Sequence, residues 1–553
     1  MKERLRQAIC AALETCFSNG TLGSGEIPTV VLEVPAHAEH GDFATNVAMT
    51  MARAEKKAPR KIAEAIVAAL GGENDLWQKV EIAGPGFINF SLTRRCWYAV
   101  LDEIDEKQER FGLSTAGAGE RVQVEFVSAN PTGPLHIGHG RGAVVGDATA
   151  AILRAVGYDV QREYYVNDAG NQVVTLGRSI WLRLRELAGE AVDFPEDCYQ
   201  GGYIRDLAID LKASDSALLD LAEEEAIKKC SAFGVCQVLE WIGADLKLFG
   251  IHFDNWYSEQ SLYDHNMVNT ELAKLAAKGL SYEQDGALWF KTTEYGDDKD
   301  RVLIKSDGSP TYFASDVAYH MEKFERGFSR VIDVWGADHH GYVPRMKAVL
   351  AGLGHPPEDL EVLLIQMVNL LRDGQPFTMG KRSGNFITLR EVIEEVGSDA
   401  CRFFFLMRRS DSQLDFDLDL AKQQSSDNPV YYVQYAHARV CSINRNAKEV
   451  GVSPPARGEV AFDRLDRDDE LALSKMLSRY PEVVEGAARH YEPHRIVFYL
   501  QELAAQFHSY YNRSKVLGDD REVSQARLYL VNCVRTVLAN ALTLLGVSAP
   551  ETM

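Results

Sequence analysis

The sequence has no long apolar run and no paired cysteines. No stretch of about 18 apolar residues occurs in the chain of 553 residues, so a transmembrane helix is not expected. Its nine cysteines are scattered without a Cys-x-x-Cys pair, which predicts reduced thiols and no cysteine zinc site. The N-terminus begins with an amphipathic helix pattern instead of a signal peptide. These features predict a cytoplasmic protein that does not enter a membrane.

The sequence also lacks a basic excess and a P-loop. With 80 acidic against 59 basic residues, the net charge is −21, which argues against a general nucleic-acid binder. Binding to RNA depends on local patches, however, so an RNA partner is compatible with this charge. No P-loop lysine motif or aspartate-rich cluster indicates a kinase or an ATPase. The length of the chain predicts two or three domains.

Residues 122–157 combine the patterns of a strand, a turn and a helix. Residues 122–128 alternate β-forming residues with others, as a strand does. The asparagine, prolines and glycine that follow interrupt regular structure and force a turn. From His136 onward apolar residues recur at helical spacing, and Gly157 is suited to end that helix. A second strand pattern follows, so the stretch is predicted to be a β-turn-α-β unit.

The predicted helix begins at two histidines, His136 and His139. A helix N-terminus offers free N–H groups and a partial positive charge, which together bind anions. The two histidines are three residues apart, so both imidazoles can lie at this end on one face. Gly138 and Gly140 leave room for a flat ring against the backbone. The pattern therefore predicts an ATP site, with the base on the glycines and the phosphates at the imidazoles.

Three other interpretations of this motif compete with the ATP site. The glycines of 138–142 resemble a dinucleotide-binding fingerprint, but the third glycine comes one residue early. The His-x-x-His spacing could hold a metal, although no cysteine or carboxylate stands beside it at ligand spacing. Both histidines could also be core residues. The surrounding strand, turn and helix favour the nucleotide site.

The same stretch resembles the class I aminoacyl-tRNA synthetases. Residues 136–139 read His-Ile-Gly-His, which is letter for letter the HIGH signature of that class. The run 124–134, Val-Glu-Phe-Val-Ser-Ala-Asn-Pro-Thr-Gly-Pro, is similar to the version found in bacterial arginyl-tRNA synthetases. The resemblance implies activation of arginine by ATP and transfer of arginine to the 3′-terminal ribose of tRNA(Arg), for protein synthesis. A synthetase for another amino acid, a silent tRNA-binding paralogue and a small nucleotidyltransferase are the alternatives.

A second candidate phosphate element is the basic segment 377–385, Phe-Thr-Met-Gly-Lys-Arg-Ser-Gly-Asn. Cations between glycines suit a segment that closes on phosphates as charge develops, although an ordinary surface turn is the alternative. The segment is similar to the KMSKS loop of class I synthetases, which Met379 and Lys381 match. The resemblance implies an ATP contact for Met379 and phosphate chemistry for Lys381, with Arg382 second. The sequence departs from the loop pattern at Thr378, Gly380 and Arg382.

Candidate residues for the amino-acid pocket follow a proline that is suited to a helix start. Tyr312 and Asp316 are four residues apart, so an aromatic ring and a carboxylate could face one cavity. From the spacing alone, a core tyrosine beside a surface aspartate is the simpler interpretation. The resemblance to arginyl-tRNA synthetases places both residues where the substrate arginine binds. It implies the same role for Glu125, Ser128, Asn130, His139, Glu259 and Asp338.

The predicted fold class is α/β, with a class I synthetase Rossmann-like parallel-sheet catalytic core. Short apolar runs at 331–335 and 362–365 are typical of buried parallel strands. Strand and helix patterns alternate before this core, including a strand at 29–34, and nearly all of the chain after it is helical. The predicted domains are an N-terminal α+β domain at 1–112, the catalytic domain at 120–425 with a helical insertion near 180–250, and an α-helical bundle at 426–553.

The partners follow mainly from the resemblance. The first domain is similar to the N-terminal domain with which arginyl-tRNA synthetases grip the tRNA elbow, and Phe87 and Asn89 are candidates for contact with a D-loop base. The last domain, with Met553 at its end, is similar to their anticodon-binding domain. Mg²⁺ is expected to accompany ATP, and neither a metal site in the protein nor a tightly bound cofactor is expected. The protein is expected to act as a monomer.

Overall fold

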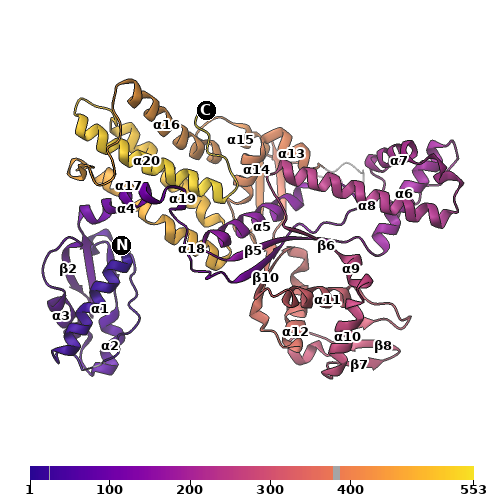
Figure 1. Ribbon diagram of the computed structural model, residues 1–553, viewed down its shortest axis with the longest axis horizontal. Coiled ribbons are helices and arrows are strands. Elements are labelled where there is room, and N and C mark those ends of the chain that lie inside the picture. Colours follow the sequence, from indigo (N-terminus) through magenta and orange to yellow (C-terminus); the bar gives the residue numbers. More distant parts are fainter. Residues whose placement is uncertain (24, 378–386) are drawn as a thin grey trace.

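The computed structural model describes residues 1–23, 25–377 and 387–553. Figure 1 shows an elongated molecule, with a small N-terminal unit at one end and a helical projection at the other. A parallel sheet lies between them, beside a bundle formed by the C-terminal helices. In the described part of the chain, no helix combines the length and the apolar character needed to cross a membrane.

The N-terminal unit packs three helices on a three-stranded antiparallel sheet of order β1-β3-β2. The predicted opening helix is confirmed, and β2 and β3 form an antiparallel hairpin. The prediction of a strand at 29–34 is wrong, because this segment forms only an isolated bridge between Glu33 and Ala44. Pro28 and Pro35 flank it and have no N–H to donate to a ladder. The elements are α1 (Lys2–Ser18), β1 (Phe43–Thr45), α2 (Val47–Glu55), α3 (Pro59–Leu70), β2 (Trp77–Ala83) and β3 (Phe87–Leu92).

Helix α4 (Arg94–Lys107) connects the N-terminal unit to the C-terminal bundle. The Trp97 side chain is buried in the N-terminal core, whereas the next residue, Tyr98, is buried in the main core. The Tyr98 hydroxyl donates a hydrogen bond of 2.6 Å to the Leu465 carbonyl. Asp102, one turn later, accepts a hydrogen bond of 3.0 Å from the Tyr529 hydroxyl. Because α4 packs against both the N-terminal unit and the C-terminal bundle, the domain boundary near 112 stays a prediction.

The core of the molecule is a five-stranded parallel sheet of order β11-β10-β4-β5-β6, which confirms the predicted fold class. Strand β4 is central, and its apolar side chains at Val122 and Val124 are fully buried. The chain passes from β4 through α5 to β5 on one side, and returns later to β10 on the other side. In such sheets ligands bind where the direction of winding changes, at the carboxyl ends of the strands. The elements are β4 (Arg121–Glu125), α5 (Ile137–Ala155), β5 (Asp159–Val166), β6 (Asn255–Ser258), β10 (Arg330–Gly336) and β11 (Leu360–Ile365).

Helices and two small sheets surround this core. The segment near 180–250, which is predicted to be an insertion, is helical, and its long helices form the projection in Figure 1. The insertion consists of α6 (Asn171–Leu187), α7 (Gly202–Ser214) and α8 (Glu223–Leu248). The elements after it are α9 (Glu259–Asp264), α10 (Met267–Ala277), β7 (Ser281–Gln284), β8 (Ala287–Phe290), β9 (Arg301–Ile304), α11 (Tyr312–Glu325) and α12 (Val343–Leu353). The last part of the core contains β12 (Val368–Arg372), β13 (Gln375–Pro376), α13 (Leu389–Val396), α14 (Ser398–Phe405), β14 (Leu414–Asp417) and α15 (Leu418–Lys422).

The C-terminal unit is a helical bundle, as predicted. Its long helices α16, α19 and α20 bury continuous apolar faces against each other. The bundle consists of α16 (Pro429–Glu449), α17 (Asp468–Ser478), α18 (Tyr480–His490), α19 (His494–Arg513) and α20 (Arg521–Leu544).

One buried arginine joins the bundle to the sheet domain. The guanidinium of Arg402, on α14, donates to the Leu545 carbonyl at 2.8 Å and to the Phe249 carbonyl at 3.1 Å. It also donates to the carboxylate of Asp147 on α5, which is itself buried. Arg402 is 1% exposed, so these contacts are shielded from water. Three segments that are distant in the sequence therefore meet at one side chain.

We expect Arg402→Met to destabilise the fold strongly, because it removes the guanidinium that is buried against the Asp147 carboxylate and leaves only Arg162, 3.4 Å away, as a cationic partner. Removing one partner of such a pair costs about 3–5 kcal/mol. Urea unfolding followed by circular dichroism measures the change as a lower midpoint. Arg409→Met is the matched control, because the pair of Arg409 with Asp411 is exposed. Equal midpoints for the two variants would contradict the structural role of Arg402.

Candidate active site

Helix α5 begins with a reciprocal cap made by the two histidines of the motif. His136 is the N-cap residue, and its Nδ1 accepts a hydrogen bond of 3.1 Å from the Gly138 N–H. Three residues later, the Nδ1 of His139 accepts from the His136 N–H at 3.3 Å. The two rings stack with their centroids 3.8 Å apart. This arrangement is a capping box in which imidazoles replace the usual hydroxyl and carboxylate.

The cap decides which atoms of the histidines can act on a ligand. An Nδ1 that accepts a hydrogen bond carries no proton, so in the neutral ring the proton is on Nε2. Burial, and then the neighbouring His136, lower the pKa of His139 to about 3. His139 is therefore a neutral Nε2–H donor at neutral pH. The structure differs in one respect from the anion site that the sequence predicts at this helix N-terminus. The Gly138 N–H donates to the His136 side chain and does not face a ligand.

The two glycines of the motif have different surroundings. A Cβ on Gly138 would lie 2.9 Å from Cε1 of His136, so glycine is needed there for the ring to take its place. A Cβ on Gly140 would lie 2.7 Å from the Leu389 side chain and 3.2 Å from that of Phe405. A side chain at position 140 would therefore clash with α13 and α14, which accounts for Gly140. Contact of either glycine with ATP stays a prediction.

The second candidate phosphate element lies mostly outside the described residues, which end at 377 and resume at 387. Met379, Lys381 and Arg382 all fall in that interval. Where the description resumes, Thr388 forms an isolated bridge with His136. The N–H of Leu389 donates to the Leu135 carbonyl at 2.8 Å. The chain therefore lies beside the N-terminus of α5 three residues after the basic segment.

The turn after β4 has an unusual backbone. Val127 and Ser128 have φ angles of 68° and 39°, in the left-handed region that L residues rarely adopt. The Ser128 hydroxyl donates to Oε1 of Glu125 at 2.9 Å, and its oxygen accepts from the Tyr165 N–H at 3.1 Å. The Asn167 side chain donates to the Ser128 carbonyl at 3.1 Å. Left-handed residues that are held by several contacts are typical of functional sites.

Three acidic residues from different elements form a second feature, which we call the acidic pocket: Glu259, Asp316 and Asp168. Burial, and then the charges of Asp316 and Asp168, raise the pKa of Glu259 to about 7. Burial also raises the pKa of Asp316, against a hydrogen bond from the Tyr342 hydroxyl. Asp168 accepts from the Ser258 hydroxyl at 2.6 Å. Carboxylates that repel each other in this way favour the binding of a cation.

The remaining predicted pocket residues lie around these features. Tyr312, at the start of α11, is 68% exposed, and a Cβ on Gly170 would lie 3.9 Å from its hydroxyl. Asp316 follows one turn later and is half-buried. Asn130 is exposed in the turn after β4. Asp338 is exposed in a 3₁₀ helix after β10, with its carboxylate 3.7 Å from His339. Their contacts with a substrate stay predictions.

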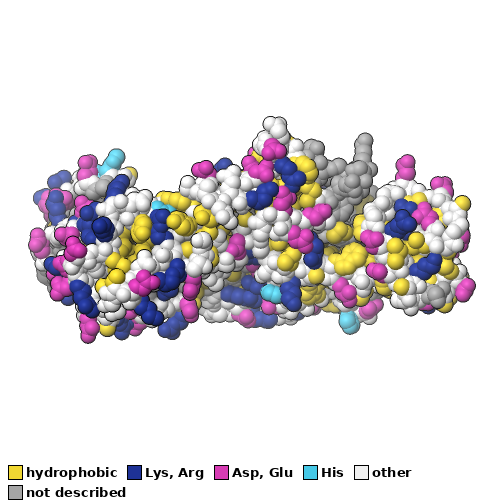
Figure 2. Space-filling model, turned by 90° about the horizontal axis from the view of Figure 1, so that it is seen from above, with side chains coloured by type: hydrophobic (Ala, Val, Ile, Leu, Met, Phe, Trp, Pro, Cys, Tyr) yellow, Lys and Arg dark blue, Asp and Glu magenta, His cyan; other side chains and the backbone are white. Residues whose placement is uncertain are grey.

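The residues predicted to bind tRNA lie at two ends of the chain. Phe87 is half-buried at the start of β3, and Asn89 is 7% exposed in the middle of that central strand. Met553 is 51% exposed. On the face shown in Figure 2, Lys and Arg side chains are interspersed with Asp and Glu instead of forming one basic field. Docking of RNA on that face would therefore depend on local groups.

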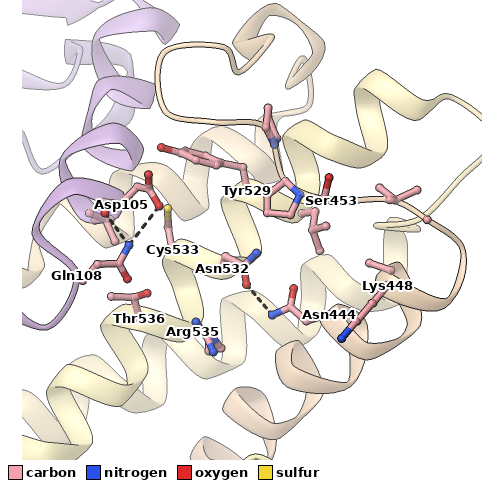
Figure 3. A pocket seen from close by; sticks show the side chains of 17 residues that line it. Asp105, Gln108, Asn444, Lys448, Ser453, Tyr529, Asn532, Cys533, Arg535 and Thr536 are labelled. Carbon is pink, nitrogen blue, oxygen red and sulfur yellow. Dashed lines mark hydrogen bonds between the residues drawn. The ribbon is translucent and has the colours of Figure 1, made fainter.

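A cavity of about 610 Å³ lies between α4, α16 and α20 (Figure 3). The Asn444 amide donates to the Asn532 side chain at 2.6 Å, and Arg535 and Lys448 also line the space. Of the described residues around this cavity, none belongs to the α5 cap or to the acidic pocket. This cavity is therefore separate from the α5 cap and from the acidic pocket.

Sequence reasoning missed several charged residues beside the site. Asp168 and Tyr342 complete the acidic pocket, and Lys323 and Asp333 are buried behind Glu125. One signal was present in the sequence, because Asp333 interrupts an apolar strand run at 331–335. An acidic residue inside such a run is rarely buried without a partner. The identity of that partner depends on the fold.

Comparisons with known proteins first define the class. Residues 104–411 match the family model "tRNA synthetases class I (R), catalytic domain", which covers more than half of the chain. Residues 3–92 match "Arginyl tRNA synthetase N terminal domain", and 433–553 match "DALR anticodon binding domain". The sheet and the histidine cap described above thus belong to a class I aminoacyl-tRNA synthetase.

Relatives then define the family. The chain is 70% identical to an arginine–tRNA ligase of Syntrophotalea carbinolica and 59% identical to one of a Geobacter species, over all of both chains in each case. The solved arginyl-tRNA synthetase of Thermus thermophilus shares its fold, with a TM-score of 0.75, 23% identity and complete coverage of both chains. The chain belongs to the arginyl-tRNA synthetase family.

The histidine cap makes a prediction for NMR. With a pKa lowered to about 3, His139 should stay neutral, with its proton on Nε2, throughout pH 5–8. Nitrogen-15 spectra of histidine-labelled protein report this tautomer, and loss of the signal in His139→Gln assigns it. Gly138→Ala should perturb the His136 signal, because its Cβ would contact that ring. A His139 signal that becomes doubly protonated between pH 8 and pH 5 would contradict the cap.

Proposed function

We propose that the histidine cap and the acidic pocket form one active site for arginine activation. As an arginine–tRNA ligase, the protein joins arginine to tRNA in two steps. The arginine carboxylate attacks the α-phosphate of ATP, the bond to the β-phosphate breaks, and arginyl-adenylate and pyrophosphate form. A hydroxyl of the 3′-terminal ribose of tRNA(Arg) then attacks the arginyl carbonyl, and AMP leaves. The observation that carries the proposal is the stacked histidine pair that caps the start of α5.

The histidines act on the α-phosphate as hydrogen-bond donors. Negative charge increases on the phosphate oxygens as the arginine carboxylate attacks, and the Nε2–H groups of His136 and His139 are oriented before the reaction begins. The neutrality of His139 is compatible with this role, because a donor need not lose a proton. ATP enters as its Mg²⁺ complex, with its base near Gly138 and Gly140. Positioning and electrostatics suffice, so no covalent intermediate with the protein is required.

The basic segment contributes the second part of the phosphate site. In this proposal Met379 contacts ATP, Lys381 binds the phosphates, and Arg382 assists. These three residues lie outside the described part of the chain, and the proposal rests on their match to the KMSKS loop. The bridge between Thr388 and His136 supports it, since the chain lies beside α5 three residues after the segment.

Arginine lies between the acidic pocket and the end of β4, both of which carry carboxylates. A guanidinium is planar and permanently charged, so Glu259 and Asp316 pair with it while Tyr312 covers it. The amino-acid end, which must reach the α-phosphate, is bound by Glu125, Ser128 and Asn130 at the end of β4. His139 and Asp338 complete the surroundings. A pocket built of charged groups discriminates strongly against uncharged amino acids, because its own carboxylates would be left unpaired.

The tRNA spans the long axis of the molecule. In this proposal Phe87 and Asn89 contact the elbow, and Met553 belongs to the anticodon-binding surface of the bundle. One chain carries both regions as well as the active site, which supports a monomer as the working form. The reaction is part of protein synthesis, and we place it in the cytoplasm.

Pyrophosphate exchange with each standard amino acid, in the presence of tRNA, tests the proposed function. Arginine alone should support exchange, and His139→Ala should reduce the rate by roughly two decades, since one preorganised donor contributes about 3–4 kcal/mol. His490→Ala, at an exposed site on α18, is the matched control and should keep the wild-type rate. A normal rate in folded His139→Ala would contradict the role of the cap. Exchange with another amino acid would contradict the arginine assignment.

The acidic pocket predicts a pH dependence of arginine binding. With a pKa raised to about 7, Glu259 is protonated below that pH in the free enzyme, whereas pairing with a guanidinium requires the carboxylate. Arginine kcat/KM should therefore fall as the pH decreases from 8 to 5.5, by about tenfold per unit below the pKa. Glu259→Gln cannot titrate at this position, so its profile should be flatter. A wild-type profile that does not change over this range would contradict the pairing.

A further inference from the structure

A row of three buried carboxylates crosses the parallel sheet beside the proposed site. Glu125 on β4 is the register partner of Glu163 on β5 and of Asp333 on β10. Paired residues of adjacent parallel strands project to the same face, so the three side chains lie next to each other. Glu163 and Asp333 are fully buried, and Glu125 is 8% exposed. We call these three residues the carboxylate row. Like charges placed together in a core require compensation.

Helix α11 supplies the compensating groups. The Nζ of Lys323 donates to Oε2 of Glu125 at 2.6 Å and to Oδ1 of Asp333 at 2.8 Å. Arg326 donates two hydrogen bonds to Glu163, at 2.6 and 2.8 Å. Lys323 is fully buried, and so its charge interacts only weakly with water. One ammonium group therefore pairs with carboxylates on two neighbouring strands.

His320 contacts Asp333, which lies at the β10 end of the carboxylate row. Its Nε2 lies 2.8 Å from Oδ2 of Asp333, and its Nδ1 lies 2.8 Å from the Asp316 carbonyl. Burial alone would raise the pKa of Asp333, but the charges of Lys323 and His320 lower it to about 2. Burial raises the pKa of Glu125, and Lys323 is the strongest opposing influence. The ammonium thus favours the ionised form of both carboxylates.

The same helix face carries proposed substrate residues. Tyr312, Asp316, His320 and Lys323 follow one another at intervals of four, four and three residues, which places them on one stripe of α11. Asp316 belongs to the acidic pocket, Tyr312 is exposed at the start of the helix, and His320 and Lys323 contact the sheet. Lys323 is thus the direct link between α11 and the last residue of β4.

We propose that Lys323 is a positioning residue for arginine recognition, which holds Glu125 in a fixed relation to the helix that carries Tyr312 and Asp316. The inference rests on the proposed function, which gives those three residues contact with arginine. Lys323 is buried behind Glu125 and does not itself contact the substrate. The Glu125 carboxylate is held on Oε2 by Lys323 and on Oε1 by Ser128, so its plane is defined from two sides.

The structure separates this effect from ATP binding. The histidine cap lies on α5 and is built from its own hydrogen bonds, whereas Lys323 contacts β4 and β10. Loss of the ammonium should release the Glu125 carboxylate and alter the distance between β4 and α11. Arginine binding should weaken, and ATP binding should not. An ion pair that served stability alone would show no such selectivity.

Steady-state pyrophosphate exchange with Lys323→Met tests the proposal. The arginine KM should rise at least about tenfold, while the ATP KM stays within about twofold of wild type. Lys274→Met is the matched control, because Lys274 joins α10 to α11 through partly exposed pairs with Glu271 and Glu325. It should leave both constants unchanged. Parallel increases in the two KM values, or a fall in kcat alone, would overturn the positioning role.

A double-mutant cycle with Glu125→Gln separates this proposal from the proposed function. If Glu125→Gln leaves the arginine KM unchanged, the assignment of Glu125 to arginine fails. If it raises the KM, Lys323→Met should add little in the Glu125→Gln background, since both changes remove the same contact. A full additional increase would show that Lys323 acts independently and would overturn the inference. Should Lys323→Met not fold, Lys323→Gln keeps amide donors without the charge, and the same outcomes decide.

Discussion

Three carboxylates can lie side by side inside a sheet only if cations are buried with them, and α11 depends on this constraint for its position. Lys323 and Arg326 are attached to residues of β4, β5 and β10, so the helix is fixed relative to three strands at once. The first turn of the same helix forms one wall of the acidic pocket. The location of the proposed arginine site therefore follows from the charge balance of the core, and apolar packing of α11 would not specify it as closely.

The proposed positions of the anionic and the cationic ligand lie at different elements of the fold. Anionic phosphates are proposed to lie at α5, where the donors are imidazoles held by their own cap. The cationic amino acid is proposed to lie near α11 and α9, where Glu259 and Asp316 repel each other. The chain leaves β4 through the left-handed turn at Val127 and Ser128 and then enters α5. In the proposed function, the two ligands would thus use largely different groups, and His139 would be the residue that contacts both.

Local patterns predicted the parts of the structure that depend on neighbouring residues. Alternation and helical spacing identified β4 and α5, and the HIGH motif located the start of the helix. The same reasoning failed at 29–34, where β-forming residues lie between two prolines. It could not find the carboxylate row, because Glu125, Glu163 and Asp333 meet only through the register of the sheet. It also could not say which imidazole nitrogen faces the ligand, since that depends on hydrogen bonds of the cap.

The two acidic clusters beside the site differ in what neutralises them. In the carboxylate row the cations are covalently part of α11, and the pKa of Asp333 is lowered accordingly. In the acidic pocket the largest influences on Glu259 are burial and two further carboxylates, so its pKa rises and a proton can take the place of a cation. A permanently charged guanidinium would displace that proton and complete the balance. The fold thus neutralises one cluster with its own side chains, and under the proposed function it leaves the other to be neutralised by the substrate, which would make the pocket select for a cation.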